Sequence, residues 1–276
     1  MNYPIYNYKN FQMDFNHPKI MGILNVTPDS FSDGGKYFSV DNAVNKALQL
    51  YDEGADIIDI GGESTRPGSD FVSLEDELSR IIPVIKKIYS LRKDIVLSID
   101  TTKSEVARQS LDNGVAIIND ISGFTFDKNM LNTAKSFDAV VVIMHIKGNP
   151  KTMQQDPYYE DVISEVKEFL TKQSEKAIEI GVEKIIVDPG IGFGKKIEDN
   201  FNLIKHLENF ESLGFPIMIG LSRKSFIGKV LELEVEERDV PTVILEAVSL
   251  LKSARIIRTH NVKYCKQMVK LVSNII

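Results

Sequence analysis

The chain has 276 residues, of which 43% are hydrophobic and 26% charged, and its formal net charge is −6. This composition excludes a disordered or low-complexity protein, and the negative charge argues against binding to nucleic acid or an anionic membrane. No apolar run reaches the roughly 20 residues that a bilayer span needs, and the start of the chain lacks the pattern of a secretory signal. The single cysteine, Cys265, cannot form an intramolecular disulfide. We therefore expect a cytoplasmic protein.

One sequence pattern recurs along the chain. A short apolar run rich in β-branched residues is followed by a turn rich in Asp, Asn, Gly, Ser or Thr, and then by an amphipathic stretch. Runs that are apolar throughout are typical of strands buried on both faces of a parallel sheet. In chain order, the predicted strands are residues 20–24, 57–60, 95–99, 115–118, 140–144, 185–187, 216–219 and 256–257.

Helical periodicity separates these strands. Apolar residues recur on one helical face over residues 43–51 and 74–85, and a longer helical pattern begins at residue 162 and ends at Gly181. About eight strand–helix units of roughly 35 residues match an α/β protein of the (β/α)8 TIM barrel type. We expect a single domain, with residues 1–19 as a short N-terminal extension and residues 20–276 as the barrel. A doubly wound open sheet shares the alternation and is the alternative.

Polar residues follow each predicted strand at the point where it ends. In a barrel and in an open α/β sheet, the chemistry lies where strands end and loops begin. Any one of these residues could be only a helix cap, but together they are expected to converge on one mouth if the strands close into a ring. In chain order they are Asn25, Glu63 to Arg66, Asp100 with Thr101, Asn119 with Asp120, His145, Asp188, Ser222 to Lys224, and Arg258 with His260.

This ring of polar groups combines an acidic set with a cationic set. The acidic, hydrogen-bonding set consists of Asp100, Asn119, Asp188 and Asp120. The cationic set consists of Lys224, Arg258 and His260. Buried carboxylates need hydrogen-bond donors, because unpaired desolvation is costly, and clustered cations favour a phosphate. The pattern predicts a ligand with a donor-rich heterocycle at one end and a phosphate or diphosphate at the other.

Three further features are less specific. Segment 190–195, Gly-Ile-Gly-Phe-Gly-Lys, could bring backbone N–H groups close to a phosphate, although it matches no nucleotide-binding glycine motif. For His145, a functional role and a structural hydrogen bond are both open. Arg258 and His260 stand two residues apart on a predicted strand, so their side chains face the same way and could hold one anion. The spacing of the histidines excludes a histidine-rich zinc site.

Eight segments together resemble the dihydropteroate synthase family, in the order and with the spacing of that family. They are MGILNVTPDSFSDGG at 21–35, DIGGESTRPG at 59–68, SIDT at 98–101, IND at 118–120, MHIKG at 144–148, DPGIGFGK at 188–195, GLSRKSFIG at 220–228 and RTH at 258–260. The resemblance implies a pterin-binding TIM barrel that acts as a transferase in folate biosynthesis. Members condense 6-hydroxymethyl-7,8-dihydropterin diphosphate with p-aminobenzoate, giving 7,8-dihydropteroate and pyrophosphate. It also implies Mg2+ as cofactor, a homodimer formed through outer helices, and competition by sulfonamides for the p-aminobenzoate pocket.

The resemblance also assigns roles to particular residues. The pterin ring would be held by Asp100, Asn119, Asp188 and Lys224, with Arg258 against its face. The diphosphate would contact Asn25, Thr65, Arg258 and His260, and Asn25 would also contact the Mg2+. The p-aminobenzoate pocket would be shaped by Phe31, Arg66, Pro67, Phe193 and Ser225. The catalytic group would be Asp100, Lys224, Arg258 and His260. An aniline nitrogen is nucleophilic at neutral pH without a strong base, so our hypothesis is a carbocation-like displacement of the diphosphate.

The chain departs from the family at three positions. The family usually has Val at Thr259 and Asp at Asn261, and often Gly at Ser253. We expect Thr259 to point away from the site, and the loss of a negative charge at Asn261 to lower the pKa of His260.

Two other functions share much of this pattern. A methyltetrahydrofolate methyltransferase also has a pterin-binding barrel, but it needs no group of cations for a diphosphate. A pterin-binding protein without catalysis would not need Asn25 or the first loop.

Overall fold

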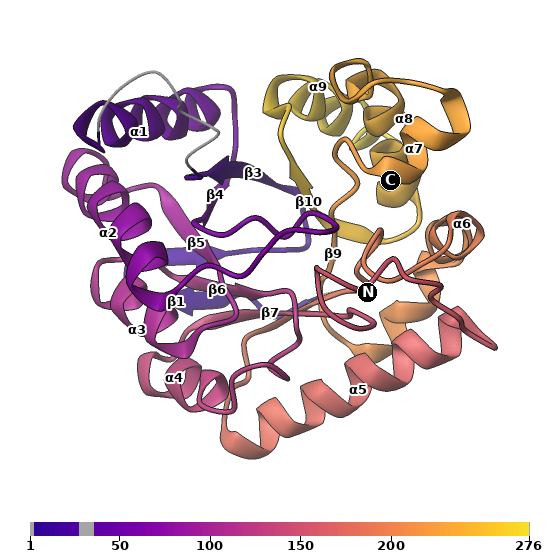
Figure 1. The fold of residues 1–276 in the computed structure, drawn as a ribbon, viewed down its shortest axis with the longest axis horizontal. Helices are drawn as coiled ribbons and strands as arrows, with labels where there is room; N and C mark the ends of the chain where they lie inside the picture. Colours follow the sequence, from indigo (N-terminus) through magenta and orange to yellow (C-terminus); the bar gives the residue numbers. More distant parts are fainter. Residues whose placement is uncertain (1–2, 28–35, 276) are drawn as a thin grey trace.

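The computed structural model describes residues 3–27 and 36–275. In it, eight parallel strands form a closed barrel (Figure 1), each pairing with the next in chain order, and the last closes against the first. These strands are β3 (Lys19–Asn25), β4 (Ile57–Gly61), β5 (Val96–Asp100), β6 (Ile117–Asp120), β7 (Val140–Met144), β8 (Ile185–Asp188), β9 (Ile217–Ile219) and β10 (Ala254–Thr259). The closed order confirms the (β/α)8 barrel and excludes the doubly wound sheet.

Helices surround the barrel, as Figure 1 shows. The α-helices are α1 (Lys36–Asp52), α2 (Leu74–Leu91), α3 (Ser104–Asp112), α4 (Met130–Phe137), α5 (Val162–Ile180), α6 (Ile197–Lys205), α7 (Ser225–Leu231), α8 (Asp239–Leu251) and α9 (Val262–Val272), and the short 3-10 helices are η2 (Leu207–Leu213) and η3 (Val235–Glu237). In the described part of the chain, none is both long and apolar enough to cross a membrane.

Local sequence signals set the ends of these helices. The Ser73 side chain accepts a hydrogen bond from the backbone N–H of Asp76 and so caps the start of α2. Gly181 ends α5 with a φ of 97°, a left-handed conformation that favours glycine. The buried face of α5 then packs against β7, a strand that is buried throughout.

The N-terminal segment contains a small antiparallel hairpin that the sequence pattern did not predict. It consists of β1 (Tyr6–Tyr8) and β2 (Phe11–Met13). The Tyr6 hydroxyl donates a 2.7 Å hydrogen bond to the backbone oxygen of Ile185, the first residue of β8. The hairpin therefore packs where the barrel strands begin, which leaves the opposite end, where the strands finish, open for a site.

Candidate active site

The carboxyl ends of the barrel strands surround one large pocket, with about 690 Å3 available to small molecules. All of the predicted site residues that the structure describes line it: Asn25, Thr65, Arg66, Pro67, Asp100, Asn119, Asp188, Phe193, Lys224, Ser225, Arg258 and His260. Phe31 lies outside the described residues. The fold thus brings together side chains that are more than 200 residues apart in the sequence, because every strand ends at the same rim.

A chain of hydrogen bonds joins four strands at the centre of the site. The Arg258 guanidinium on β10 donates from Nη2 to Oδ2 of Asp100 and from Nε to Oδ2 of Asp59, both at 2.7 Å. The same Asp59 oxygen accepts a 2.9 Å hydrogen bond from Nδ2 of Asn119. We did not predict a role for Asp59. The available signal was a charged residue inside the apolar run of β4, since an unpaired charge is costly in a barrel core.

Burial shifts the pKa values of the two carboxyl groups in the pocket upward. The pKa of Asp100 is raised to about 7, mainly by burial and against the opposing charge of Arg258. The pKa of Asp188 is raised to about 6, again mainly by burial, while a 2.7 Å hydrogen bond from the backbone N–H of Gly190 and the charge of Lys224 oppose the shift. Both carboxylates are therefore short of donors, which a heterocycle rich in N–H groups would supply.

Lys224 is the cation that faces these carboxylates from the start of α7. Burial and the nearby Arg258 lower its pKa to about 8, although Asp188 and Asp100 act in the other direction. Its Nζ lies 3.9 Å from the centre of the Phe193 ring, a cation–π geometry. Lys224 thus links the carboxylate end of the pocket to its aromatic wall.

An apolar cluster that we did not predict forms one side of the pocket. It consists of Ile121, Met144, Ile146, Met153 and Phe193. Most of these residues line the pocket directly. Flat apolar walls next to a few convergent polar groups are typical of sites for small aromatic ligands. Single apolar residues in loops or at the end of an apolar strand, such as Met144, carry no distinctive sequence signal, which is why only Phe193 was predicted.

His260 lines the pocket, but the expectation that it is cationic is wrong. Burial is the main cause that lowers its pKa to about 3, and the surrounding charges of Arg258, Arg223, Arg66 and Lys224 lower it further. Its Nδ1 lies 2.9 Å from the hydroxyl oxygen of Ser222. A neutral imidazole held in this way contributes a hydrogen bond, while the positive charge comes from the basic side chains around it.

Asp120 and His145, two of the polar residues at strand ends, line neither the main pocket nor the smaller one beside it. Asp120, which we grouped with the acidic set, accepts hydrogen bonds from the backbone N–H and the hydroxyl of Ser122, both at 2.7 Å, and so holds the turn after β6. His145 makes a structural contact, since its Nδ1 lies 2.9 Å from the ammonium nitrogen of the buried Lys195. Hydrogen bonds within the protein, and not a ligand, therefore explain why these two positions are polar.

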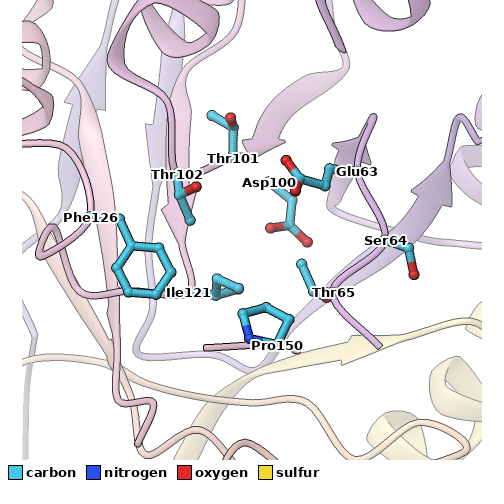
Figure 2. A pocket seen from close by; sticks show the side chains of 9 residues that line it. All are labelled: Glu63, Ser64, Thr65, Asp100, Thr101, Thr102, Ile121, Phe126 and Pro150. Atoms are coloured by element: carbon cyan, nitrogen blue, oxygen red, sulfur yellow. The ribbon is translucent and has the colours of Figure 1, made fainter. Parts of the chain in front are cut away.

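A smaller side pocket adjoins the main one at Asp100 (Figure 2). It offers about 20 Å3, room for about one water molecule. Figure 2 shows the Asp100 carboxylate surrounded by side chains of Glu63, Thr65, Thr101, Thr102 and Phe126. Glu63 is paired with Lys103, which also donates to the buried Glu77 at 2.6 Å. The side pocket therefore places Asp100 beside several polar side chains and room for about one water molecule.

Two of the three departures from the family, Thr259 and Asn261, lie at the end of β10 next to His260, whereas Ser253 precedes the start of that strand. Asn261 caps α9 by accepting a hydrogen bond from the backbone N–H of Tyr264. Its amide also donates to Oδ2 of Asp239 at 2.9 Å, and Asp239 forms an ion pair with Arg223. The carboxylate near His260 is therefore on Asp239. Thr259 is buried beside Glu246 of α8. The structure gives no specific consequence of Ser253, whose φ of 76° would suit the glycine that the family often has.

Comparison with known proteins identifies the family. Residues 21–260 match the pterin binding enzymes. A dihydropteroate synthase of Synechocystis is 47% identical over 255 residues, which cover 91% of this chain and 88% of the relative. The Yersinia pestis dihydropteroate synthase in a sulfonamide drug complex has a TM-score of 0.93 and 37% identity, over 99% of each chain. The Xanthomonas albilineans enzyme in complex with 7,8-dihydropteroate has a TM-score of 0.89 and 35% identity, over 99% of this chain and 98% of that one.

A TIM barrel whose pocket pairs carboxylates with cations at the strand ends, and whose sequence matches this family over most of its length, defines a pterin-binding enzyme. Within that class, the chain belongs to the dihydropteroate synthase family, whose members are transferases of folate biosynthesis.

Proposed function

We propose that this chain joins 6-hydroxymethyl-7,8-dihydropterin diphosphate to p-aminobenzoate, releasing pyrophosphate and 7,8-dihydropteroate. The observation that carries the proposal is that one pocket holds the carboxylates of Asp100 and Asp188 at one end and the cations Lys224 and Arg258 next to them. Such a pocket accepts N–H groups and at the same time draws an anionic leaving group away. The methyltransferase alternative does not explain the cations.

The pterin ring binds at the carboxylate end. Its N–H donors meet Asp188 and Asn119, while Lys224 donates to a ring acceptor and Arg258 lies against the ring face. The buried oxygen Oδ1 of Asn119 has no hydrogen-bond partner among the described residues, which supports its use by a ligand. The raised pKa of Asp188 supports the same reading, because a carboxyl group in this state gains from two new donors.

The diphosphate binds toward Thr65, Arg258 and His260. Among the described residues, no cluster of three or more His, Cys, Asp or Glu side chains is placed to hold a metal ion. This fits Mg2+, which keeps several waters and binds through one or two protein oxygens together with substrate phosphates. Asn25, which lines the pocket, has a side-chain amide that offers one such oxygen. Bound there with the substrate, Mg2+ would neutralise part of the charge of the departing pyrophosphate.

The displacement follows a carbocation-like path. The bond between the pterin methylene carbon and the diphosphate oxygen breaks before the new carbon–nitrogen bond is complete, and the nitrogen then releases one proton to water. Asp100 stabilises the positive charge that develops near the pterin, and Arg258 and Lys224 stabilise the departing anion. Such a path requires charged side chains held in fixed positions and does not require a general base. The site, which offers no obvious general base, is consistent with it.

The p-aminobenzoate ring binds at the outer end of the pocket. Phe193 and Pro67 supply apolar contacts, and Ser225 and Arg66 supply polar ones toward the carboxylate; Phe31 is assigned here too, by resemblance. Arg66 is exposed, which places a positive charge where the second substrate enters. Sulfonamides, which resemble p-aminobenzoate, compete for this end.

The enzyme works in the cytoplasm, and two copies of the chain associate there through their outer helices. The surface of α8 supports this dimer, because it exposes four large apolar residues that are spaced by three or four positions: Val240, Ile244, Val248 and Leu251. An apolar stripe of this kind on a helix is typical of a surface that is covered in the assembled protein.

An assay of pyrophosphate release tests the proposed function. With both substrates and Mg2+ present, we expect pyrophosphate and dihydropteroate in equal amounts, and inhibition by a sulfonamide that more p-aminobenzoate reverses. Exchange of labelled pyrophosphate into the pterin substrate without p-aminobenzoate tests the carbocation-like path. Absence of product with both substrates would refute the proposed function, whereas absence of exchange alone would refute only the path.

A further inference from the structure

Asp59 is a fully buried carboxylate at the base of the pocket. It is not among the pocket-lining residues, so it acts on a ligand only through its neighbours. One of its oxygens, Oδ2, accepts hydrogen bonds from both Asn119 and Arg258, at 2.9 and 2.7 Å. Burying a charge is costly, and this carboxylate forms hydrogen bonds to two residues that line the pocket. Packing alone therefore does not explain why it is there.

The contact with Asp59 determines which way the Asn119 amide faces. A side-chain amide has one accepting and one donating end, and either end can be turned toward a neighbour. An ionised carboxylate only accepts hydrogen bonds, so Asp59 selects the donating Nδ2. The other end, Oδ1, is buried and has no partner among the described residues, and it remains an acceptor for a ligand in the pocket.

The same carboxylate fixes Arg258. With Nε on Asp59 and Nη2 on Asp100, the guanidinium plane is held at two separate points. An arginine held in this way loses little side-chain freedom when it meets a flat ring or an anion. One buried oxygen therefore orients both an acceptor and a cation of the pocket.

We propose that Asp59 is a positioning residue that gives the pocket its preference for the N–H-bearing edge of a pterin, by turning the Asn119 amide oxygen toward the ligand and by fixing Arg258. The inference rests on the proposed function, since it concerns how the same pocket recognises the pterin. It predicts that Asp59 contributes to pterin affinity and contributes little to p-aminobenzoate binding.

Variants of similar size separate this role from mere burial. Asp59→Asn keeps an oxygen that can accept from both neighbours, whereas Asp59→Leu has no acceptor. Ser98→Ala is the matched control, because Ser98 is the register partner of Asp59 on β5 and is also buried, but its hydroxyl makes no hydrogen bond to the described residues. Calorimetry with 6-hydroxymethyl-7,8-dihydropterin diphosphate and Mg2+ gives Kd and the fraction of active sites, and steady-state kinetics gives KM for p-aminobenzoate.

We expect Asp59→Leu to raise Kd for the pterin substrate at least tenfold and to change KM for p-aminobenzoate less than twofold. Asp59→Asn should stay within about threefold of the original Kd, and Ser98→Ala should match it. A variant that merely folds poorly would show fewer sites with an unchanged Kd, and that result would overturn the proposal. So would equal losses in the Leu and Asn variants.

A double-mutant cycle tests whether Asp59 acts through Asn119. In the background of Asn119→Ala, the amide that Asp59 orients is gone, so Asp59→Leu should raise Kd by a clearly smaller factor than in the original protein. Equal factors in both backgrounds would refute the coupling. If the original protein makes no dihydropteroate, the proposed function itself fails; if it does and the cycle is additive, only the role of Asp59 fails.

Discussion

The ammonium nitrogen of Lys195 lies 2.9 Å from Nδ1 of His145, and the same group donates to the backbone oxygens of Gly190 and Phe193 at 2.8 and 3.0 Å. One buried cation thus ties the loop after β8, which carries the aromatic wall of the pocket, to the end of β7. We expect Lys195→Met to destabilise the protein by about 3 kcal/mol, because three buried hydrogen bonds are lost. It should also raise KM for p-aminobenzoate severalfold. Urea unfolding and steady-state kinetics measure the two effects.

The neighbouring lysine provides the control for this prediction. Lys196 is exposed, and its side chain forms an ion pair with the exposed Asp156, at 3.3 Å. Lys196→Met should therefore change the free energy of unfolding by less than about 0.5 kcal/mol. Similar effects of the two substitutions would contradict the role that we assign to Lys195.

The affinity for the pterin should fall at acidic pH. Burial raises the pKa of Asp188 to about 6 and that of Asp100 to about 7, so both carboxyl groups gain protons as the pH falls below 7. A protonated carboxyl accepts fewer hydrogen bonds, so a ligand rich in N–H groups prefers the ionised form and releases protons when it binds near pH 6. Calorimetry in buffers of different ionisation enthalpy measures this release between pH 5 and 8.

Asp188→Asn serves as the comparison for the pH dependence. It should bind the pterin much more weakly at pH 7, and its remaining affinity should vary less with pH than that of the original protein. A Kd that is the same at pH 5 and pH 8 in the unchanged protein would argue against Asp188 and Asp100 as the acceptors of the pterin.

The sequence was sufficient to predict the barrel and most of the residues in its mouth. Apolar runs and helical periodicity mark each strand–helix unit, and closure of the ring follows from their number and length. Polar residues at strand ends, such as Asp188 and Arg258, are visible in the sequence because the strands themselves are apolar. Because all eight strands end at the same rim of the barrel, these residues converge there. The prediction therefore did not require knowledge of any contact between them.

What the sequence did not reveal depends on contacts between distant segments. Asp59 lies within a strand, and only the approach of Arg258 and Asn119 explains why a charge is tolerated there. The neutral state of His260 depends on burial and on four cations from three separate segments of the chain. Asp120 and Asp100 look alike in the sequence, each at the end of a strand, but one faces a turn and the other faces the pocket.

Lys224→Ala should reduce activity far more than it reduces stability. Burial lowers the pKa of Lys224 to about 8, which means that the fold gains little from holding this cation. The departing diphosphate, in contrast, loses a nearby positive charge. We expect kcat/KM to fall at least a hundredfold (about 2.7 kcal/mol in the transition state). Thermal unfolding of the same variant should show a melting temperature within a few degrees of the original, and a matched large fall would favour a structural role.

Alanine substitutions at Gly190 and Gly214 distinguish two causes of lost stability, an unfavourable backbone conformation and steric crowding by the new Cβ. Both have a positive φ, 70° and 80°. A Cβ on Gly190 would stand 1.8 Å from the backbone oxygen of His145, whereas a Cβ on Gly214 would meet no atom within 4 Å among the described residues other than its chain neighbours. Gly214→Ala should therefore cost about 1 kcal/mol, and Gly190→Ala clearly more, with loss of pterin binding because the backbone N–H of Gly190 donates to Asp188. Equal losses of stability on urea unfolding would contradict this explanation.

Glu246 should make the protein less stable as the pH rises. This carboxyl group lies buried between α8, β10 and α9, and burial raises its pKa to about 8, against the opposing effect of the neighbouring Thr259 hydroxyl and Cys265 thiol. Between pH 4.5 and 8 the folded state holds a proton that the unfolded state has lost, so the free energy of unfolding decreases with pH, by at most about 1.4 kcal/mol per unit. Glu246→Gln should remove the contribution of this group, so that the slope becomes shallower, above all between pH 7 and 8, and the variant should be more stable than the original protein at pH 8.5. Exposed Glu175→Gln on α5 is the control and should leave the slope in place; an unchanged slope in Glu246→Gln would show that the buried carboxyl is not its source.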